Sequence, residues 1–285
     1  MKNFFIITNG LKDEGLKVTK RLKSYIEYRG ANVSYHVTMM EREKIYSVSE
    51  DTIPEGTQLI FVLGGDGTLL RVSRDLLRLQ IPFIGVNLGT LGYLCELVED
   101  TMCEAVDRIM NNEYMVEDRM MLKSLGEDKG IALNDIVIHR EGKTQMVRLT
   151  IYLNGLFLGV YNADGIIVAT PTGSTGYNMS AGGPIVDPQA QMILITPINS
   201  HTLGNKSIVI SDSDKVEIEL SRRRPQEDET ASICYDGDVY RTIGVGERIE
   251  IVRTRRTVKI LKLNDVSFWG ILQAKMRSED ESRGM

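Results

Sequence analysis

The N-terminal part of the chain alternates between short apolar runs and stretches with helical spacing. Residues 4–7 predict a short buried strand, and apolar residues then recur at steps of three and four over 18–26 before Gly30, which can end a helix. The same alternation continues with a strand pattern at 33–37, an apolar run at 59–63, a helical pattern over 69–79, an apolar run at 81–86 and a helical pattern over 102–110. Strands that alternate with helices predict a parallel sheet covered by helices.

From about residue 114 the apolar residues take on the period of strands. They alternate over 147–153 up to Asn154-Gly155, a two-residue hairpin signal, and Asp236-Gly237 can form a similar turn. Later strand patterns lie at 192–195, 207–210, 216–220, 249–252 and 258–261. This part is therefore predicted to be all-β, and helical spacing returns over 268–276.

These patterns predict an α/β N-terminal domain with a parallel sheet, followed by an all-β, sandwich-like C-terminal domain. The expected boundaries are residues 1–110 for the first domain and 111–264 for the second. A C-terminal helix, 265–277, is expected to pack back on the N-terminal domain. A chain of 285 residues with 42% hydrophobic content is long enough to bury a core in each of two domains.

Charge and cysteine usage narrow the class of protein. The formal net charge is -5 and the pI about 5.4, so no basic surface for a phosphate polymer is indicated and nucleic acid is not an expected partner. No apolar stretch approaches the length of a membrane span, so a membrane partner is not expected either. Cys95, Cys103 and Cys234 lack C-x-x-C spacing and fit reduced thiols, which predicts a cytoplasmic protein.

The first candidate site is a glycine loop between an apolar run and a helical pattern, at 59–70. Its Gly-Gly-Asp-Gly-Thr sequence, 64–68, lets backbone amides approach a phosphate, and the helix start behind it supplies unpaired donors. The tetrapeptide Gly-Asp-Gly-Thr alone is equally compatible with a turn between two strands, but the helical pattern that follows favours the anion site. Neither the P-loop nor the dinucleotide-binding fingerprint is present.

The second candidate site is a loop rich in hydroxyl groups and glycine, within 164–177. Hydroxyls and exposed amides can bind a ribose or a base edge, and Tyr177 offers a ring for stacking. On composition alone, an ordinary surface loop rich in Pro, Gly, Ser and Thr is the favoured interpretation of this segment.

The glycine loop resembles the signature shared by NAD kinases, diacylglycerol and sphingoid-base kinases and, more distantly, phosphofructokinases. In that group the aspartate, here Asp66, is taken to be the catalytic base, and a carboxylate beside a phosphate site can accept a hydroxyl proton. The second loop, together with 180–184, resembles the long signature of NAD kinases alone. Further matches lie at 87–94, 133–135 and 197–203, so that the resemblance covers roughly 59–276.

The resemblance to NAD kinases implies transfer of the γ-phosphoryl group of ATP to the 2′-hydroxyl of the adenosine ribose of NAD, giving NADP. It implies Asp66 as the catalytic residue. It implies that the residues binding NAD or ATP are Gly67, Arg71, Asn134, Asp135, Gln145, Asn162, Asp164, Thr172, Thr175, Gly176, Tyr177, Asn178, Ser180 and Asp238. Without the family, Asn134-Asp135 is equally well a turn or a bulge, and His201 is expected to be structural.

The chain departs from the family pattern at two of these positions. Asp135 stands where the family more often has glutamate, and Gly176 where it usually has alanine. The expected cofactor is Mg²⁺ that enters with ATP, because the sequence has no dedicated metal cage. The resemblance also implies a homodimer or a homotetramer.

Two other functions remain open at the level of sequence. A lipid kinase of the diacylglycerol or sphingoid type shares the glycine loop, although no basic amphipathic helix or lipidation signal supports it. A non-catalytic NAD-binding sensor on the same scaffold is the third interpretation.

Overall fold

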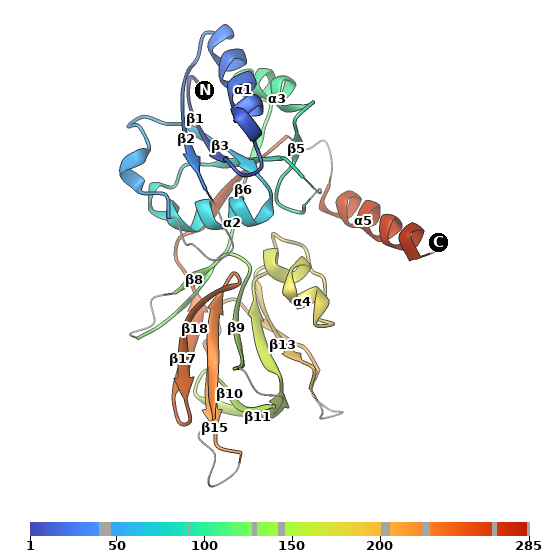
Figure 1. Ribbon diagram of the computed structural model, residues 1–285. Helices are drawn as coiled ribbons and strands as arrows, with labels where there is room; N and C mark the ends of the chain where they lie inside the picture. Colours follow the sequence, from blue (N-terminus) through green and yellow to red (C-terminus); the bar gives the residue numbers. More distant parts are fainter. Residues whose placement is uncertain are drawn as a thin grey trace. The chain divides into compact units, whose positions relative to one another are not determined.

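The computed structural model describes residues 1–39, 47–89, 92–126, 130–141, 146–200, 206–223, 229–263 and 267–283. The chain divides into two compact units (Figure 1). Unit 1 consists of Met1–Asp118 and Val258–Met285, and unit 2 consists of Arg119–Thr257. The expected fold class, an α/β unit and an all-β unit, is confirmed.

Unit 1 is built on a seven-stranded sheet with the order β2-β1-β3-β4-β19-β6, and β5 pairs with β4. The strands are β1 (Asn3–Asn9), β2 (Asn32–Thr38), β3 (Leu59–Gly64), β4 (Phe83–Asn87), β5 (Leu97–Val98), β6 (Met115–Arg119) and β19 (Val258–Lys262). The pairs β1/β2, β1/β3 and β3/β4 are parallel. Because β1 lies between β2 and β3, the strand order changes direction at β1, and this switch point is where open α/β sheets bind ligands.

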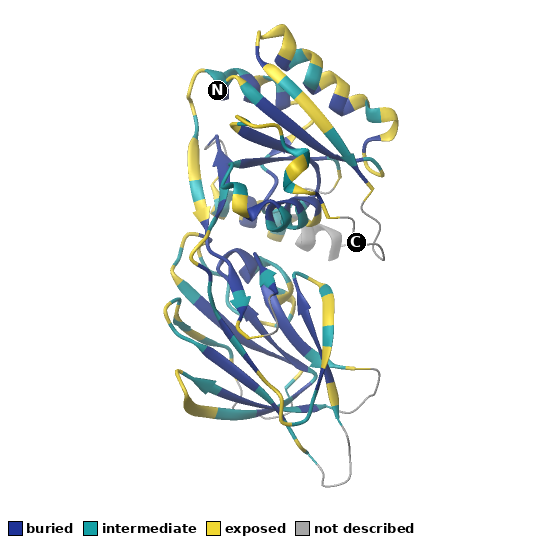
Figure 2. Cartoon of the chain, turned by 90° about the vertical axis from the view of Figure 1, so that its left-hand side faces the viewer, coloured by how far each residue is buried: buried dark blue, intermediate teal, exposed yellow. Residues whose placement is uncertain are grey.

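Three helices pack against this sheet: α1 (Lys17–Tyr28), α2 (Asp66–Asp75) and α3 (Met102–Met110). Unit 1 also contains α5 (Phe268–Arg283) and short 3₁₀ turns at Glu14–Leu16, Glu50–Thr52 and Leu77–Leu79. Leu22 of α1 and Val106 of α3 share one core with Phe61 of β3, and Leu69 and Val72 bury α2 against β3 and β4. The strands β1, β3 and β4 of this sheet are buried along most of their length (Figure 2).

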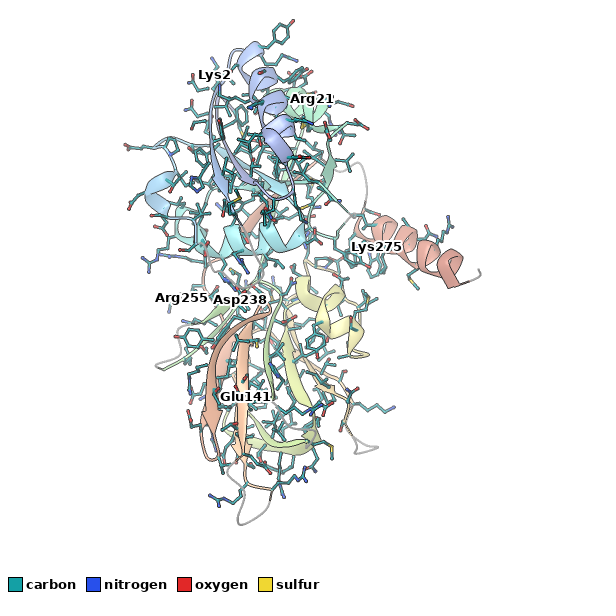
Figure 3. The ribbon with its side chains drawn as sticks, viewed as in Figure 1. Lys2, Arg21, Glu141, Asp238, Arg255 and Lys275 are labelled. Atoms are coloured by element: carbon teal, nitrogen blue, oxygen red, sulfur yellow. The ribbon has the colours of Figure 1, made fainter. Side chains whose placement is uncertain are left out.

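The C-terminal helix packs on unit 1, as expected from the sequence. The rings of Phe268 and Tyr93 lie 6.4 Å apart, and the ammonium of Lys275, labelled in Figure 3, lies 3.9 Å from the centre of the Tyr93 ring. Ile271 and Leu272 are buried. The helix continues to Arg283, beyond the expected end at residue 277.

Unit 2 is a sandwich of two antiparallel six-stranded sheets, with the orders β11-β10-β15-β18-β7-β8 and β14-β13-β12-β9-β16-β17. The strands of the first sheet are β7 (Leu122–Ser124), β8 (Ile131–Ala132), β10 (Val147–Leu153), β11 (Leu156–Ala163), β15 (Val216–Ser221) and β18 (Arg248–Arg253). Those of the second are β9 (Asp135–Arg140), β12 (Gly165–Ala169), β13 (Met192–Ile198), β14 (Ile208–Ser211), β16 (Thr230–Tyr235) and β17 (Asp238–Gly244). Side chains of both sheets, such as Leu149 and Ile138, form one core.

Both predicted two-residue hairpins are present in unit 2. Asn154-Gly155 joins β10 to β11, and Asp236-Gly237 joins β16 to β17. All four residues have positive φ, with values of 52° and 82° in the first turn and 49° and 84° in the second. These values fit a type I′ turn, whose twist suits a hairpin.

The domain boundaries differ from those expected. Residues 111–118 and 258–264 are expected in the all-β domain from their strand pattern, but β6 and β19 join the sheet of unit 1. A strand pattern shows that a segment is extended and which side is buried, and it does not show which sheet the segment joins. The helix expected over 69–79 is also shorter, because α2 ends at Asp75 and a 3₁₀ turn follows.

No helix in the described ranges is both long enough and apolar enough to cross a membrane.

Candidate functional site

The glycine loop joins β3 directly to α2, as the helical pattern favoured. Gly64 ends β3, and Gly65 is the extended residue that precedes the helix. A Cβ on Gly64 would lie 2.4 Å from Oγ1 of Thr68, so only glycine fits this close approach. Gly67 is exposed in the first turn of α2, and Arg71 is half-buried one turn further along. The first amides of a helix are unpaired donors, so this end of α2 can bind an anion.

The carboxylate of Asp66 is held by three backbone amides. The N–H of Tyr93 donates to Oδ2 at 2.6 Å, and the N–H groups of Leu94 and Cys95 donate to Oδ1 at 3.2 and 3.1 Å. A carboxylate has about four acceptor positions, so the three amides leave one for a further donor such as a hydroxyl group. The neighbouring thiol of Cys95 also interacts with this carboxylate. The amides thus fix Asp66 in orientation and leave it one acceptor position.

Gly92 makes this arrangement possible, and sequence reasoning gave it no role. A Cβ on Gly92 would lie 1.9 to 2.1 Å from the carboxylate atoms of Asp66. The thiol of Cys95 lies close by, and burial, followed by the charge of Asp66, raises its pKa far above the usual value. Cys95 is therefore a neutral thiol at physiological pH and not a nucleophile.

In unit 2 a cavity of about 810 Å³ lies on the second sheet, on the side away from the sandwich core. Four of the predicted residues line it: Asn134, Asp135, Asp164 and Tyr177. The alternation of β9 explains the placement, because Asp135 points to the cavity whereas Ile136 points into the core. The structure therefore brings together side chains from two motifs that lie apart in the sequence.

Asp236 organises one side of this cavity. It stands in the hairpin turn before β17, and its carboxylate accepts hydrogen bonds from the N–H groups of Leu133 at 2.9 Å, Asn134 at 2.7 Å and Asp135 at 3.2 Å. The sequence marked Asp236 only as a turn residue. The buried Oδ1 of Asn134 has no hydrogen-bond partner among the described groups, so it can accept a hydrogen bond from a ligand in the cavity.

Further cavity residues were not singled out from the sequence. Arg140 forms an ion pair with Asp164 at 2.9 Å, and Nδ2 of Asn199 donates to the same carboxylate at 3.1 Å. Sγ of Cys234 lies 3.4 Å from Nε2 of His139. Isolated residues of these types on separate strands carry no local sequence signal, and only the sheet register brings them to one place.

The predicted residues of the 170s segment have different surroundings. The segment forms a 3₁₀ turn, Thr172–Thr175, and one turn of helix, α4 (Tyr177–Ser180). A Cβ on Gly176 would lie 3.4 Å from Nδ2 of Asn134 and 3.8 Å from Oδ2 of Asp135, so Gly176 adjoins the cavity residues. Thr172 is buried, with an unpartnered Oγ1 among the described groups, whereas Thr175 is half-buried and Ser180 exposed.

The side chain of Asn178 is hydrogen-bonded within the fold. It is fully buried, and its Nδ2 donates to the carbonyl oxygens of Ser174 at 3.2 Å and Pro184 at 2.9 Å. Its Oδ1 accepts a hydrogen bond from Thr196 at 2.7 Å. The amide thus shapes the loop from within, and a contact of Asn178 with a ligand stays a prediction.

The remaining predicted residues lie outside the cavity lining or outside the described ranges. Asn162 is near the end of β11, and Asp238, labelled in Figure 3, is the first residue of β17. Neither lines the cavity, but the charges of Asp135 and Asp238 both raise the pKa of the Cys234 thiol, after burial as the main cause. Gln145 and His201 fall outside the described residues.

The carboxyl group of Asp135 is held in a partly neutral state by its surroundings. Burial, and then the negative charge of Asp236, raise its pKa from 3.8 to about 7. Near neutral pH the group therefore exists in both forms. The protonated form can donate a hydrogen bond to a ligand, and the ionised form can only accept one.

We expect the raised pKa of Asp135 to make the folded chain less stable as pH rises from about 4 to 7. In that window the folded state keeps a proton that the unfolded state has released, so stability is lost with rising pH and levels off above the folded pKa. Asp135→Asn removes this penalty and should raise the free energy of unfolding at pH 8 by up to about 4 kcal/mol, at 1.36 kcal/mol per pKa unit.

Urea unfolding of both proteins at several pH values measures this effect. The difference between variant and wild type should shrink as the pH approaches 4. The exposed Asp100, changed to asparagine, is the matched control and should show no such trend. A variant less stable than wild type at pH 8 would contradict burial and the charge of Asp236 as the source of the penalty.

Comparison with known proteins identifies the family of this chain. A family model described as the ATP-NAD kinase N-terminal domain matches residues 4–114, and one described as the ATP-NAD kinase C-terminal domain matches residues 133–263. An NAD kinase of Agathobacter rectalis is 50% identical over 279 residues, which cover 97% of this chain and 99% of that protein. An NAD kinase of Lachnoclostridium phytofermentans is 40% identical, with coverage of 96% and 99%.

Solved structures share the fold. An NAD kinase from Archaeoglobus fulgidus in complex with ATP superposes with a TM-score of 0.77 and 24% identity, covering 97% of this chain and 99% of that one. A yeast NADH kinase complexed with NADH has the same TM-score and identity, with coverage of 92% and 83%. On the evidence of both family models and of these relatives, the chain belongs to the NAD kinase family.

Proposed function

We propose that the protein transfers the γ-phosphoryl group of ATP to the 2′-hydroxyl of the adenosine ribose of NAD, giving NADP and ADP. The single observation that supports this most is the carboxylate of Asp66 at the start of α2, which three amides fix in place while they leave it one acceptor position. Family membership supplies the identity of the two substrates.

In the proposed reaction the open position on Asp66 accepts a hydrogen bond from the 2′-hydroxyl. The hydroxyl oxygen forms a bond to the γ-phosphorus as the bond from phosphorus to the β–γ bridging oxygen breaks, and ADP leaves with that electron pair. The hydroxyl proton passes to the carboxylate of Asp66 and from there to solvent. Gly67 in the first turn of the same helix and Arg71 one turn further along are proposed to contact the triphosphate.

The cavity of unit 2 is proposed as the binding site for NAD. Its polar groups match a dinucleotide, because Asn134 and Asp135 can bond to hydroxyl or amide groups and the exposed ring of Tyr177 can stack on a heterocycle. Thr172, Thr175, Gly176, Asn178 and Ser180 would shape this site from the adjoining segment. Asn162, Asp164, Asp238 and Gln145 remain proposed contacts from the family resemblance.

Mg²⁺ is proposed to enter with ATP. In the described ranges no group of three His, Cys, Asp or Glu side chains could hold a metal ion. Mg²⁺ usually keeps several waters and binds through substrate phosphates and one or two carboxylates, so the residues present fit a metal carried by ATP. When bound, it neutralises charge on the β- and γ-phosphates.

We also propose a cytoplasmic location and a homodimer or homotetramer. Cys95, Cys103 and Cys234 are free thiols, which suits a reducing compartment. Leu156 and Phe157, on the edge strand β11, are 75% and 64% exposed and would be covered in an oligomer.

The test is incubation of the purified protein with Mg-ATP and NAD, with NADP detected by an NADP-specific dehydrogenase. NADP formation that requires ATP is the expected result. Calorimetric binding of NAD without any product would favour the sensor, and phosphorylation of diacylglycerol or a sphingoid base in vesicles, without NADP formation, would favour the lipid kinase.

A further inference from the structure

The loop that follows β1 lies at the switch point of the unit 1 sheet, beside the glycine loop. β1 and β3 are parallel neighbours, with Thr8 opposite Leu63 in the register. The chain therefore leaves both strands at the same edge of the sheet, where ligands of open α/β sheets bind. Residues 9–13 and 64–67 are thus the two segments that flank this point.

Buried side chains fix both ends of this loop. Oδ1 of Asn9 accepts a hydrogen bond from the N–H of Leu11 at 3.1 Å, and its Nδ2 lies 3.4 Å from Oγ1 of Thr68 in α2. At the other end the carboxylate of Asp13, 2% exposed, accepts hydrogen bonds from the N–H of Thr19 at 2.9 Å and from its hydroxyl at 2.6 Å. These hydrogen bonds therefore fix the two ends of the loop and, with them, the position of its tip.

Lys12 stands at this tip with its ammonium over the glycine loop. Its Nζ lies 2.9 Å from the position that a Cβ on Gly65 would occupy. Across the part of the chain that the structure describes, this ammonium has no hydrogen bond or ion pair. Its charge also acts to lower the pKa of the Cys95 thiol, whose own amide donates to Asp66. An unpaired ammonium group thus lies beside the backbone of the glycine loop and near the carboxylate of Asp66.

Lys262 is the other cation that acts on Cys95, and it is already neutralised. Its Nζ lies 3.6 Å from the carboxylate of Glu96, and both side chains are largely buried. The same carboxylate accepts a hydrogen bond from the N–H of Leu263 at 3.1 Å. The charge of Lys262 is therefore used within the fold. Of these two cations, Lys12 is the one that can bind a ligand.

We propose that Lys12 binds the γ-phosphate of ATP and neutralises negative charge on the phosphoryl group as it is transferred. This inference rests on the proposed function and names a residue for the donor half of the same site. Catalysis of phosphoryl transfer is almost entirely positioning and charge stabilisation, so one correctly placed ammonium has a large effect. The glycine loop itself carries no lysine, and a loop from the neighbouring strand supplies one.

The experiment compares wild type with Lys12→Met, which keeps the length of the side chain and removes its charge. We expect kcat/KM for ATP to fall by roughly 10²-fold, as when one transition-state donor is removed. The KM for NAD should stay within about twofold, since Lys12 acts on the donor. The same fold loss is expected with GTP as donor, because the contact is to phosphate and not to the base. Lys12→Arg, which keeps the charge, should recover most of the activity.

Lys17→Met is the matched control, because Lys17 is an exposed lysine at the start of α1, away from the glycine loop in the sequence. It should behave as wild type. Calorimetric titration of Mg-ATP in the absence of NAD gives a readout independent of turnover, and Lys12→Met should bind ATP more weakly while NAD affinity is unchanged. Equal ATP affinity and activity in Lys12→Met and wild type would overturn the proposal, and so would a parallel loss of NAD affinity. If wild type forms no NADP but Lys12→Met still loses ATP affinity, the proposed function fails and the role of Lys12 stands.

Discussion

Asp66→Asn should lower the turnover of NAD phosphorylation by roughly 10²- to 10⁴-fold, the usual effect of removing a general base. An asparagine fills the same space but cannot take the proton of the acceptor hydroxyl. Its NH₂ group also faces backbone N–H groups whose hydrogen bonds the carboxylate now accepts, so at least one of three hydrogen bonds is lost. The loss of that bond should reduce the free energy of unfolding by about 1 to 3 kcal/mol.

The measurement is kcat for NADP formation, together with NAD affinity by calorimetry and a urea unfolding curve. NAD affinity is expected to stay near wild type, because the carboxylate is used in the transition state. Near-normal turnover would exclude Asp66 as the base. A loss of turnover that appears only where the variant is unfolded would assign the carboxylate a structural role alone.

Gly92→Ala is expected to lower turnover by about 10²-fold without touching a substrate. The new methyl group would lie 1.9 to 2.1 Å from the carboxylate atoms of Asp66, a distance that no pair of non-bonded atoms tolerates. Either the carboxylate or the backbone that carries the Tyr93 amide must move, and a displacement of about 1 Å at a reacting group can cost 10²-fold.

Gly89→Ala is the control for this effect. Gly89 belongs to the same connection after β4, and a Cβ there meets no atom within 4 Å. This variant should keep its turnover, whereas Gly92→Ala should lose it at unchanged ATP and NAD affinity. Wild-type activity in Gly92→Ala would show that the position of the Asp66 carboxylate is not critical.

Local sequence signals were sufficient for most of the fold. The glycine loop could be placed between a strand and a helix because the apolar period changes at Asp66, and both hairpins could be placed because Asn-Gly and Asp-Gly accept positive φ. The two-domain division followed from the same change of period. These features depend on neighbours in the sequence, which pattern analysis can use.

Features that depend on sheet register could not be predicted in this way. Residues 258–261 were expected in the all-β domain, and the pairing of β19 with β4 instead places them in unit 1. His139 and Cys234 face one cavity only because β9 and β16 pair with each other. No spacing in the sequence predicts that pairing. Gly92 had no assigned role because its importance comes from a carboxylate 26 residues earlier in the chain, as the numbering shows.

Resemblance to a family and hydrogen-bond geometry give different kinds of information about the site. Asn134, Asp135, Asp164 and Tyr177 were named from the family, and the structure places them at one cavity. Asn178 was named in the same way, but its amide is consumed by carbonyl groups of its own loop. A motif therefore indicates that a segment matters, and hydrogen-bond partners decide which of its side chains can face a ligand.

The position of β19 between β4 and β6 has a consequence for biosynthesis. The first strand of the unit 1 sheet begins at residue 3. The place between β4 and β6 is filled only when β19, residues 258–262, has left the ribosome. Unit 2, which is continuous from 119 to 257, has all its strand partners available earlier. The half of the protein that is made first is thus completed last, and until then β4 and β6 present open backbone edges of the kind that promote aggregation of nascent chains.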